Sequence, residues 1–359
     1  MKINKNSHTE IRIINVERGL SILIKTPQSY CILYDLGSTS SFSPVATFYK
    51  NKLFDTFVPY TEPEKNSKKI AQCIISHPHL DHISDLNIDN TNILKENSFY
   101  VTCQNDKVEG KSDRDNKSGH KINFKRINNP ENAADEIENY KDLYKTRNLP
   151  LSTLIHHDES ITKNLKIGYY YITHQTADGL FPEDNQKYSN SLSIVLYISH
   201  GDNSILIPGD VTPEAIKLII DGKCEKRFTD YSIIQGANKK IEWATSTSDQ
   251  PNLKTLLKRG LTILVAPHHG LESGYPDYLF EVMGEKKPDL IIISEKTHNS
   301  SNSGSTHKNY QNGIASSGRN HKNEWRYSLS TVNDSHIKIT FTGNDCITDS
   351  NKEIEKIFE

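Results

Sequence analysis

Short apolar runs separated by polar breaks characterise the first quarter of the chain. The runs at 10–16, 20–25 and 30–34 are rich in isoleucine, leucine and tyrosine, a pattern typical of short β-strands. A fourth run, 70–76, is followed directly by a histidine. Residues 42–69 contain three prolines and many polar side chains, so we expect a loop there.

From about residue 130 onward, strand-like and helix-like segments alternate. Asn129-Pro130 and Thr212-Pro213 each place a capping side chain before a proline, which predicts that helices begin there. We expect helices at 130–147, 212–222, 253–258 and 276–283, and strands at 167–173, 192–199, 204–207, 261–266, 289–294 and 326–341. Strands first and strand–helix pairs afterwards are typical of an α/β sandwich, in which helices cover packed sheets on the outside.

Composition narrows the classes of function. The 359 residues include 43 lysines and arginines against 45 aspartates and glutamates, which argues against attachment to nucleic acid or membrane through bulk positive charge. Apolar residues make up only 35%, so polar insertions dilute the core. The chain has neither an apolar run of the ~20 residues that cross a membrane nor a signal-peptide-like start. We therefore expect a cytoplasmic protein that contacts no membrane.

Residues 75–82, Ile-Ser-His-Pro-His-Leu-Asp-His, carry the strongest chemical signal. Imidazole and carboxylate groups are ligands for zinc, manganese and iron. His77 and His79 are alternate residues and can therefore hold one ion from the same side. Asp81 and His82 can turn toward a second ion nearby. The alternative interpretation is a histidine-rich loop exposed to solvent.

Two further predicted strands end in residues of the same kinds. Asp210 follows the run 205–209, and a carboxylate at that point can bridge two cations roughly 3.5–4 Å apart. It can also be read as an acidic residue before the helix at Thr212. His268 and His269 follow the strand at 261–266. Of this pair we expect one ligand and one bystander; His268 is our first choice as the ligand, and His269 is the alternative.

In this order the motifs resemble those of metallo-β-lactamase-fold hydrolases, most of all the hydrolase domain of the DNA-uptake protein ComEC and its stand-alone relatives. The similarity covers roughly residues 10–343. Its parts are the hairpin at 15–24, the turn Tyr34-Asp35-Leu36-Gly37-Ser38, the HxHxDH run, the strand at 190–195, Gly209-Asp210 and Pro267-His268-His269-Gly270. The resemblance implies an αββα sandwich that binds two divalent ions, zinc or manganese.

The chain also departs from the family's pattern. The first motif is usually Gly-Gln-Gly-Asp, whereas the polar residues here are Glu17 and Arg18, and an expected His-Pro pair appears as His307-Lys308. We expect one domain over residues 1–359. Within it, 104–147 and 223–252 look like insertions where substrate choice could lie, and 296–324 looks like a flexible loop.

The family implies one more histidine ligand between the HxHxDH run and the bridging aspartate. His174, after the strand at 167–173, is our first choice. His156 and His157, flanked by Leu154-Ile155, are the alternatives. For each of them, a surface histidine without a metal is the other interpretation.

The resemblance also implies a mechanism, in which a water bridging two ions becomes a hydroxide that attacks the substrate. Asp81 or Asp210 could orient that water or accept its proton. Asp35 is expected to accept a hydrogen bond from a ligand histidine and so orient its ring. His269 or His307 could give a proton to the leaving oxygen.

Three functions compete. The first is a nuclease or phosphodiesterase acting on nucleic acid or a nucleotide, mildly supported by seven lysines and arginines against four acids in 104–128, although a solvated loop explains that excess equally well. The second is hydrolysis of an ester, thioester or lactam by the same metal centre. The third is a metal-binding subunit that needs a protein partner in a larger complex, for example in defence against foreign DNA.

Overall fold

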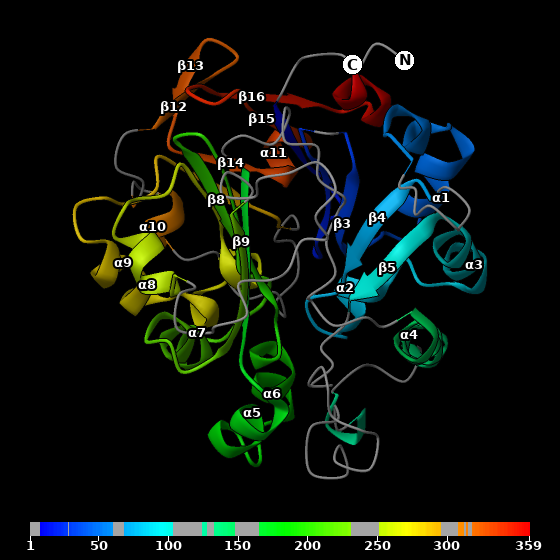
Figure 1. Ribbon diagram of the computed structural model, residues 1–359, viewed down its shortest axis with the longest axis horizontal. Coiled ribbons are helices and arrows are strands. Elements are labelled where there is room, and N and C mark those ends of the chain that lie inside the picture. Colours follow the sequence, from blue (N-terminus) through cyan, green and yellow to red (C-terminus); the bar gives the residue numbers. More distant parts are fainter. Residues whose placement is uncertain are drawn as a thin grey trace.

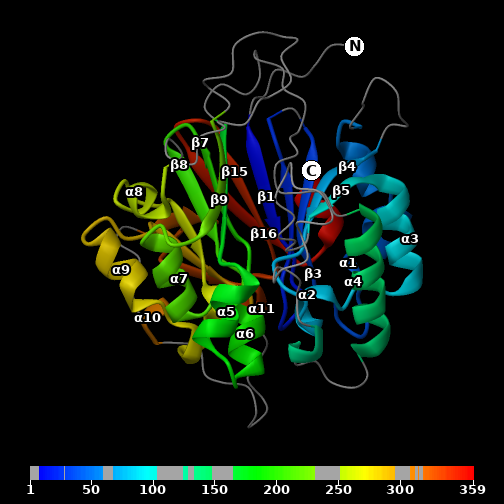
Figure 2. The ribbon, with the colours of Figure 1, turned by 60° about the horizontal axis from the view of Figure 1, so that its bottom comes forward.

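The computed structural model describes residues 8–27, 29–59, 68–102, 124–127, 133–147, 165–230, 251–295, 308–311, 314 and 318–359. Within these ranges, the strands form two sheets that stack on each other (Figure 1). Figures 1 and 2 both show α1, α3 and α4 outside one sheet and α7, α8 and α9 outside the other. The predicted αββα sandwich is confirmed.

The larger sheet has nine strands among the described residues. In spatial order they are β13 (Glu324–Arg326), β12 (Arg319–His321), β16 (Cys346–Asn351), β15 (His336–Phe341), β1 (Thr9–Ile13), β2 (Ser21–Lys25), β3 (Cys31–Leu36), β4 (Ile70–Ile74) and β5 (Ser98–Thr102). Strands β3, β4 and β5 are parallel neighbours. Parallel strands end at the same edge of a sheet, so Asp35 and the residues after β4 lie at one edge.

The smaller sheet has seven strands in the described part of the chain. They are β14 (Ser328–Ser330), β11 (Leu290–Ile293), β10 (Ile263–Val265), β8 (Asn203–Ile207), β7 (Val195–His200), β6 (Leu165–Tyr171) and β9 (Glu225–Asp230). Strand β10 lies between β8 and β11 and is parallel to both. The residues that follow β8 and β10 are therefore brought together at one edge of this sheet.

Period-two alternation assigns each strand residue to one of three apolar layers. Ile205 and Ile207 of β8 pack in the core between the two sheets, together with Ile11 and Ile13 of β1. Leu206, which lies between the two isoleucines, packs against the helices outside the smaller sheet. Because both faces of β8 are covered, its sequence is a continuous apolar run rather than an alternating one.

The helices lie outside the two sheets or in the loops that connect their strands. They are α1 (Pro44–Lys50), α2 (Leu80–Ile83), α3 (Ile88–Asn97), α4 (Ala134–Arg147), α5 (His174–Leu180), α6 (Asn185–Ser191), α7 (Pro213–Ile220), α8 (Leu253–Leu257), α9 (Asp277–Met283), α10 (Lys308–Gln311) and α11 (Thr331–Asp334), with short 3-10 turns at Leu53–Thr56, Phe124–Arg126, Pro267–Gly270, Glu272–Gly274 and Ile354–Phe358. No helix in the described ranges is long and apolar enough to cross a bilayer.

The expected loop over 42–69 is wrong in its first half, where α1 lies. Ser43 caps this helix by accepting a hydrogen bond from the backbone N–H of Ala46 at 3.1 Å. Pro44 occupies the first helical turn, where proline favours a helix start. Val45 and Phe48 are buried against the larger sheet. The same serine/threonine–proline signal correctly predicts the start of α7.

Part of the segment expected to be a flexible loop, 296–324, contains regular secondary structure. Tyr310 of α10 is buried, with its ring 5.1 Å from that of Tyr275, and β12 pairs with β13 and β16. A segment of polar composition thus contributes a buried tyrosine and strand pairing where it is described. Residues 296–307 lie outside the described residues. The two expected insertions are described only in part, by α4 and by β9, which pairs with β6.

Candidate metal centre

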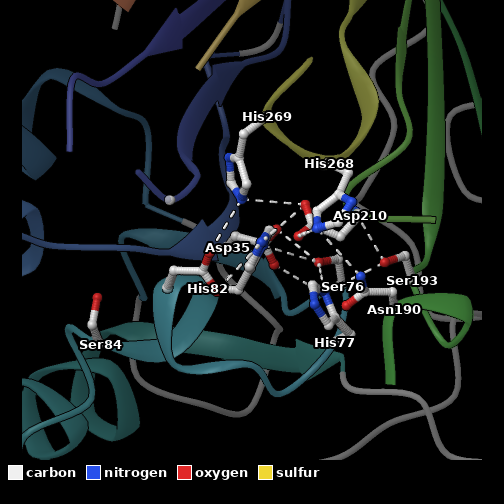
Figure 3. Close-up of polar contacts among 12 residues, drawn as sticks. Asp35, Ser76, His77, His82, Ser84, Asn190, Ser193, Asp210, His268 and His269 are labelled. Atoms are coloured by element: carbon white, nitrogen blue, oxygen red, sulfur yellow. Dashed lines mark hydrogen bonds and ion pairs between the residues drawn. The ribbon is translucent and has the colours of Figure 1, made fainter. Parts of the chain in front are cut away.

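Four side chains that can bind a metal converge at the shared edge of the two sheets. Asp81 and His82 follow β4, Asp210 follows β8, and His269 follows β10. Each offers one ligand atom, and these four atoms lie within 4.8 Å of one another. Figure 3 shows the imidazoles and carboxylates turned toward a common centre. Three strand ends that are far apart in sequence therefore build one site, as the sequence predicts.

Asp210 lies at the middle of this cluster. Its Oδ1 atom is 3.2 Å from His82 Nε2 and 3.4 Å from His269 Nε2. His269 Nε2 is also 3.2 Å from Oδ2 of Asp81. His82, Asp210 and His269 are all buried. Asp210 therefore lies beside two imidazoles that could bind the same ion.

His77 and His79 extend the cluster on the side of the larger sheet. Their ring centroids are 4.7 Å apart, and the His77 ring lies 4.3 Å from that of His82. Among the described residues, the buried Nε2 atoms of His77 and His79 have no hydrogen-bond partner. A buried polar atom without a partner costs roughly 1–3 kcal/mol. A divalent cation would satisfy these lone pairs, so the residues present fit a metal ion.

The protonation states agree with a set of metal ligands. Burial, reinforced by the charges of neighbouring imidazoles, holds the pKa of His77 well below its usual value. Burial likewise lowers the pKa of His79 to about 4. Both rings are therefore neutral near pH 7, which is the form that binds a metal.

The other two imidazoles respond to the carboxylates. Burial lowers the pKa of His269, but Asp210 and Asp81 outweigh burial and raise it to about 9. Burial also opposes protonation of His82, yet Asp210 and Asp35 raise its pKa well above its usual value. The carboxylates thus make the electrostatic potential at these imidazoles strongly negative. A proton and a metal ion therefore compete for the same imidazole nitrogens.

Asp35 fixes the orientation of His82 from below the cluster. Its Oδ2 atom accepts a hydrogen bond from His82 Nδ1 at 2.7 Å, and it also binds the Ser76 hydroxyl at 2.8 Å. The backbone N–H of Ser76 donates to Oδ1 at 2.6 Å. With Nδ1 engaged, His82 presents Nε2 to the cluster. The expected role of Asp35 agrees with this contact, and its φ of +57° shows a backbone held in the left-handed region.

The choice between His268 and His269 depends on an unusual backbone. Both residues are left-handed, with φ of 49° and 56°. His269 Nδ1 lies 3.1 Å from the carbonyl oxygen of Ser294, which leaves Nε2 for the cluster. His268 lies at the rim, with Nε2 3.8 Å from Asp210 Oδ2. The tight turn needs Gly274, because a Cβ there would lie 2.5 Å from the Cβ of His268.

The other expected histidines are placed differently. His174 is buried at the first residue of α5. Its role as a ligand stays a prediction. The alternatives His156 and His157, and the expected proton donor His307, lie outside the described residues.

Sequence reasoning missed the hydroxyl groups that support the cluster. Ser193 Oγ accepts a hydrogen bond from the backbone N–H of Asp210 at 3.1 Å and lies 3.3 Å from Nδ1 of His77. Asn190 Nδ2 is 3.4 Å from Nε2 of His268. The strand expected at 190–195 is wrong, because Asn190 belongs to α6 and β7 begins only at Val195. The motif therefore forms a polar turn that faces the site (Figure 3).

Comparisons with known proteins leave the family open. No protein-family model matches the chain. Over 201 residues it is 27% identical to the chaperone protein HtpG of Buchnera aphidicola subsp. Schizaphis graminum, a match that covers 50% of this chain and 32% of the chaperone. The chain thus spans about a third of the length of this curated relative. An identity this low over so short a part does not assign the chain to the chaperone's family.

Two solved structures show a remote likeness. The metallo-beta-lactamase fold protein YhfI from Bacillus subtilis is 12% identical with a TM-score of 0.36, and the match covers 90% of this chain and 95% of YhfI. A candidate metal-dependent hydrolase from Parabacteroides distasonis is 13% identical with a TM-score of 0.34, covering 80% and 94%. Likenesses this weak assign no family, so the functional conclusion has to come from the site itself.

Proposed function

We propose that the chain is a metal-dependent hydrolase that cleaves phosphodiester bonds in nucleic acid or in a small nucleotide. One observation carries the proposal: buried imidazole nitrogens and carboxylate oxygens face one another at the shared edge of two sheets, and the Nε2 atoms of His77 and His79 have no hydrogen-bond partner among the described residues. A set of facing lone pairs is unfavourable in a buried site unless a cation lies between them.

The residues divide naturally between two divalent ions, for which zinc and manganese are the best candidates. One ion would be held by His77 and His79 with His174, the other by Asp81, His82 and His269, and Asp210 would be shared. Such ions, when bound, lower the pKa of a shared water and offset the negative charge that develops on a substrate oxygen. In this proposal His269 takes the ligand role that the motif pattern alone assigned to His268.

The protein's own groups position these ligands. Asp35 holds the His82 ring through Nδ1, and the Ser294 carbonyl does the same for His269. The His268 side chain is 15% exposed against 4% for His269, so His268 is the one that a bound substrate can reach. We assign proton delivery to the leaving oxygen to His268 for this reason.

Phosphodiester cleavage is favoured over carbonyl attack by the order of the motifs, which resembles that of the ComEC hydrolase domain. The experiment is hydrolysis of bis(p-nitrophenyl) phosphate, and of single- and double-stranded DNA and RNA, with Mn²⁺, Zn²⁺, Mg²⁺ or EDTA. The variant carrying both His79→Ala and Asp81→Ala should be inactive. Asp202→Ala removes an exposed carboxylate on the turn between β7 and β8 and should behave like the wild type.

Three outcomes separate the candidate functions. Metal-dependent cleavage that disappears only in the double variant supports the proposal. Cleavage of a thioester without cleavage of any phosphodiester would overturn the phosphodiester part and leave a metal-dependent hydrolase. A chain that binds metal ions and cleaves nothing would point to a subunit that needs a partner.

A further inference from the structure

The loop between β1 and β2 lies directly against the metal centre. The backbone N–H of Leu20 donates to the carbonyl oxygen of Asp81 at 3.4 Å, and the Leu20 carbonyl accepts from Gly37 at 2.8 Å. On the other side, the Ser294 hydroxyl donates to the Gly19 carbonyl at 2.6 Å. Ser294 is also the residue whose own carbonyl lies beside His269. The loop is therefore hydrogen-bonded to the proposed ligand Asp81 and to Ser294, the residue whose carbonyl oxygen lies beside His269.

The shape of this loop is strongly constrained. Gly19 has a φ of +142°, and a Cβ at this position would lie 2.5 Å from the carbonyl oxygen of Asp81. Glu17 has a φ of +58°, and its N–H donates to Asn15 Oδ1 at 3.1 Å. Unfavourable backbone conformations persist only where the surrounding contacts enforce them. Arg18, between these two residues, is thereby held at a defined place beside the cluster.

Arg18 differs from the comparable arginines in having no acidic partner among the described residues. Arg12, Arg126, Arg319 and Arg326 are buried or half-buried, and each forms an ion pair with a carboxylate. Arg18 is half-buried too, yet its side chain forms no ion pair or hydrogen bond with the residues that the structure describes. The N–H donors of Arg18 are therefore available to an anion.

Arg18 adjoins a residue that packs against the backbone of Asp81. Its Cα is one peptide unit, ~3.8 Å, from that of Gly19, which packs on Asp81. An arginine side chain spans several further bonds, so the guanidinium can reach a substrate bound above Asp81. Its planar fork of N–H donors matches the two free oxygens of a phosphate group.

We propose that Arg18 is a specificity-determining residue that binds the anionic phosphate of a phosphodiester substrate. The inference builds on the proposed function and narrows it, because a neutral ester or thioester offers no anion for this side chain. A phosphodiester carries one negative charge that the two free oxygens share, which is the group that a guanidinium binds with two parallel hydrogen bonds.

The test compares an anionic with a neutral substrate at the same metal centre. Mn²⁺-loaded wild type and Arg18→Ala are assayed on bis(p-nitrophenyl) phosphate and on p-nitrophenyl acetate, and binding of inorganic phosphate is measured by calorimetry. We expect Arg18→Ala to raise the KM for the phosphodiester and the Kd for phosphate by about tenfold or more. Metal content and acetate hydrolysis should not change.

Two variants serve as controls. Arg18→Lys keeps the charge and loses the fork, so it should lie between the wild type and Arg18→Ala. Arg259→Gln removes an exposed arginine after α8 and should leave phosphate binding as it is. An Arg18→Ala protein that binds phosphate as tightly as the wild type, with its metal content intact, would overturn the inference.

Phosphate binding is measured separately from cleavage, so the proposed function and the proposed role of Arg18 can fail independently. If the wild type cleaves no phosphodiester but loses phosphate binding on Arg18→Ala, the proposed function fails and the anion site stands. If the wild type cleaves phosphodiesters and Arg18→Ala changes neither KM nor Kd, the proposed function stands and the role of Arg18 in binding phosphate fails. A single-stranded oligonucleotide and a cyclic dinucleotide are then each tested as competitors of the chromogenic substrate. The stronger competitor shows whether the phosphate belongs to nucleic acid or to a small nucleotide.

Discussion

Two clusters of buried charged side chains adjoin the larger sheet, and they are satisfied in different ways. On its outer face, Arg12 of β1 forms an ion pair with Glu10, donates from Nε to the Ile357 carbonyl at 2.8 Å and lies over the Phe358 ring at 4.6 Å. Nη1 of Arg12 is its only nitrogen without a hydrogen bond among the described residues. At the sheet edge, by contrast, imidazoles face imidazoles and carboxylates.

The difference separates a structural cluster from a functional one. Opposite charges from the protein cancel in the cluster of Glu10 and Arg12, so nothing further has to bind there. The metal centre instead collects lone pairs, and the Nε2 atoms of His77 and His79 meet no donor among the described residues. Buried polar atoms without a partner in the protein indicate a site where a ligand, here a metal ion, binds.

Removal of the shared carboxylate should have the largest effect. Asp210→Ala takes away the oxygen that lies between His82 and His269, so kcat/KM for bis(p-nitrophenyl) phosphate should fall by more than the ~10–100-fold that loss of a supporting hydrogen bond costs. Steady-state kinetics at saturating Mn²⁺ measure this. Activity within tenfold of the wild type would remove Asp210 from the site.

Breaking the structural cluster should affect stability and leave chemistry alone. Arg12→Met leaves the buried Glu10 carboxylate with His8 and Lys25 as its remaining partners, which should lower the free energy of unfolding by up to about 3 kcal/mol. Urea unfolding measures the loss, and kcat of the folded variant should equal that of the wild type. Adding Glu10→Gln should restore part of the stability. An Arg12→Met protein as stable as the wild type would show that the ion pair of Glu10 and Arg12 is not needed for stability.

The same pair predicts how stability depends on pH. Burial raises the pKa of Glu10, but the hydrogen bond from His8 and the charges of Arg12, Lys25 and Lys338 outweigh it and lower the pKa from 4.5 to about 2. A carboxyl group with a lowered folded-state pKa stabilises the protein above its unfolded pKa. That contribution, roughly 3 kcal/mol, is lost as the pH falls from about 4.5 toward 2.

Glu10→Gln isolates this effect. Unfolding measured at about pH 5 and about pH 3 should show a smaller loss of stability on acidification in the variant than in the wild type. Equal losses in both proteins would assign the acid sensitivity to other carboxylates, such as those of the metal centre.

Asp35→Asn should have a smaller effect, confined to the functional cluster. Asparagine tolerates the left-handed backbone at φ +57°, so the change tests the carboxylate and not backbone strain. Loss of the charged acceptor for His82 should weaken metal binding by about 10–100-fold. A competition titration with a chelating dye measures the affinity. Unchanged affinity would show that the contact of 2.7 Å has no bearing on the ligand.

Much of this architecture can be predicted from local sequence. Continuous apolar runs such as 205–207 identify strands covered on both faces, and the residues that follow such runs must lie at a sheet edge. From the sequence alone, that rule predicts that His77, Asp210 and the pair His268-His269 lie close together, but not which histidine of the pair faces the cluster. The helix at 44–50 shows that a cap followed by proline is a stronger signal than the number of prolines nearby.

Other features depend on tertiary contacts that no local pattern reveals. Ser193 and His77 are 116 residues apart and meet only because the two sheets stack. His268 and His269 both adopt left-handed backbone, so strand alternation cannot decide which of the two faces the cluster. That Arg18 has no ion pair with the described residues likewise becomes visible only in the structure.

The central claim is that the facing imidazoles and carboxylates hold metal ions. The most direct test is the number of ions bound per chain, measured by mass spectrometry of the elements after loading with Mn²⁺ or Zn²⁺ and removal of free metal. The wild type should retain two ions, and the variant with His79→Ala and Asp81→Ala should lose them while staying folded. A folded wild-type chain that retains none would contradict the account.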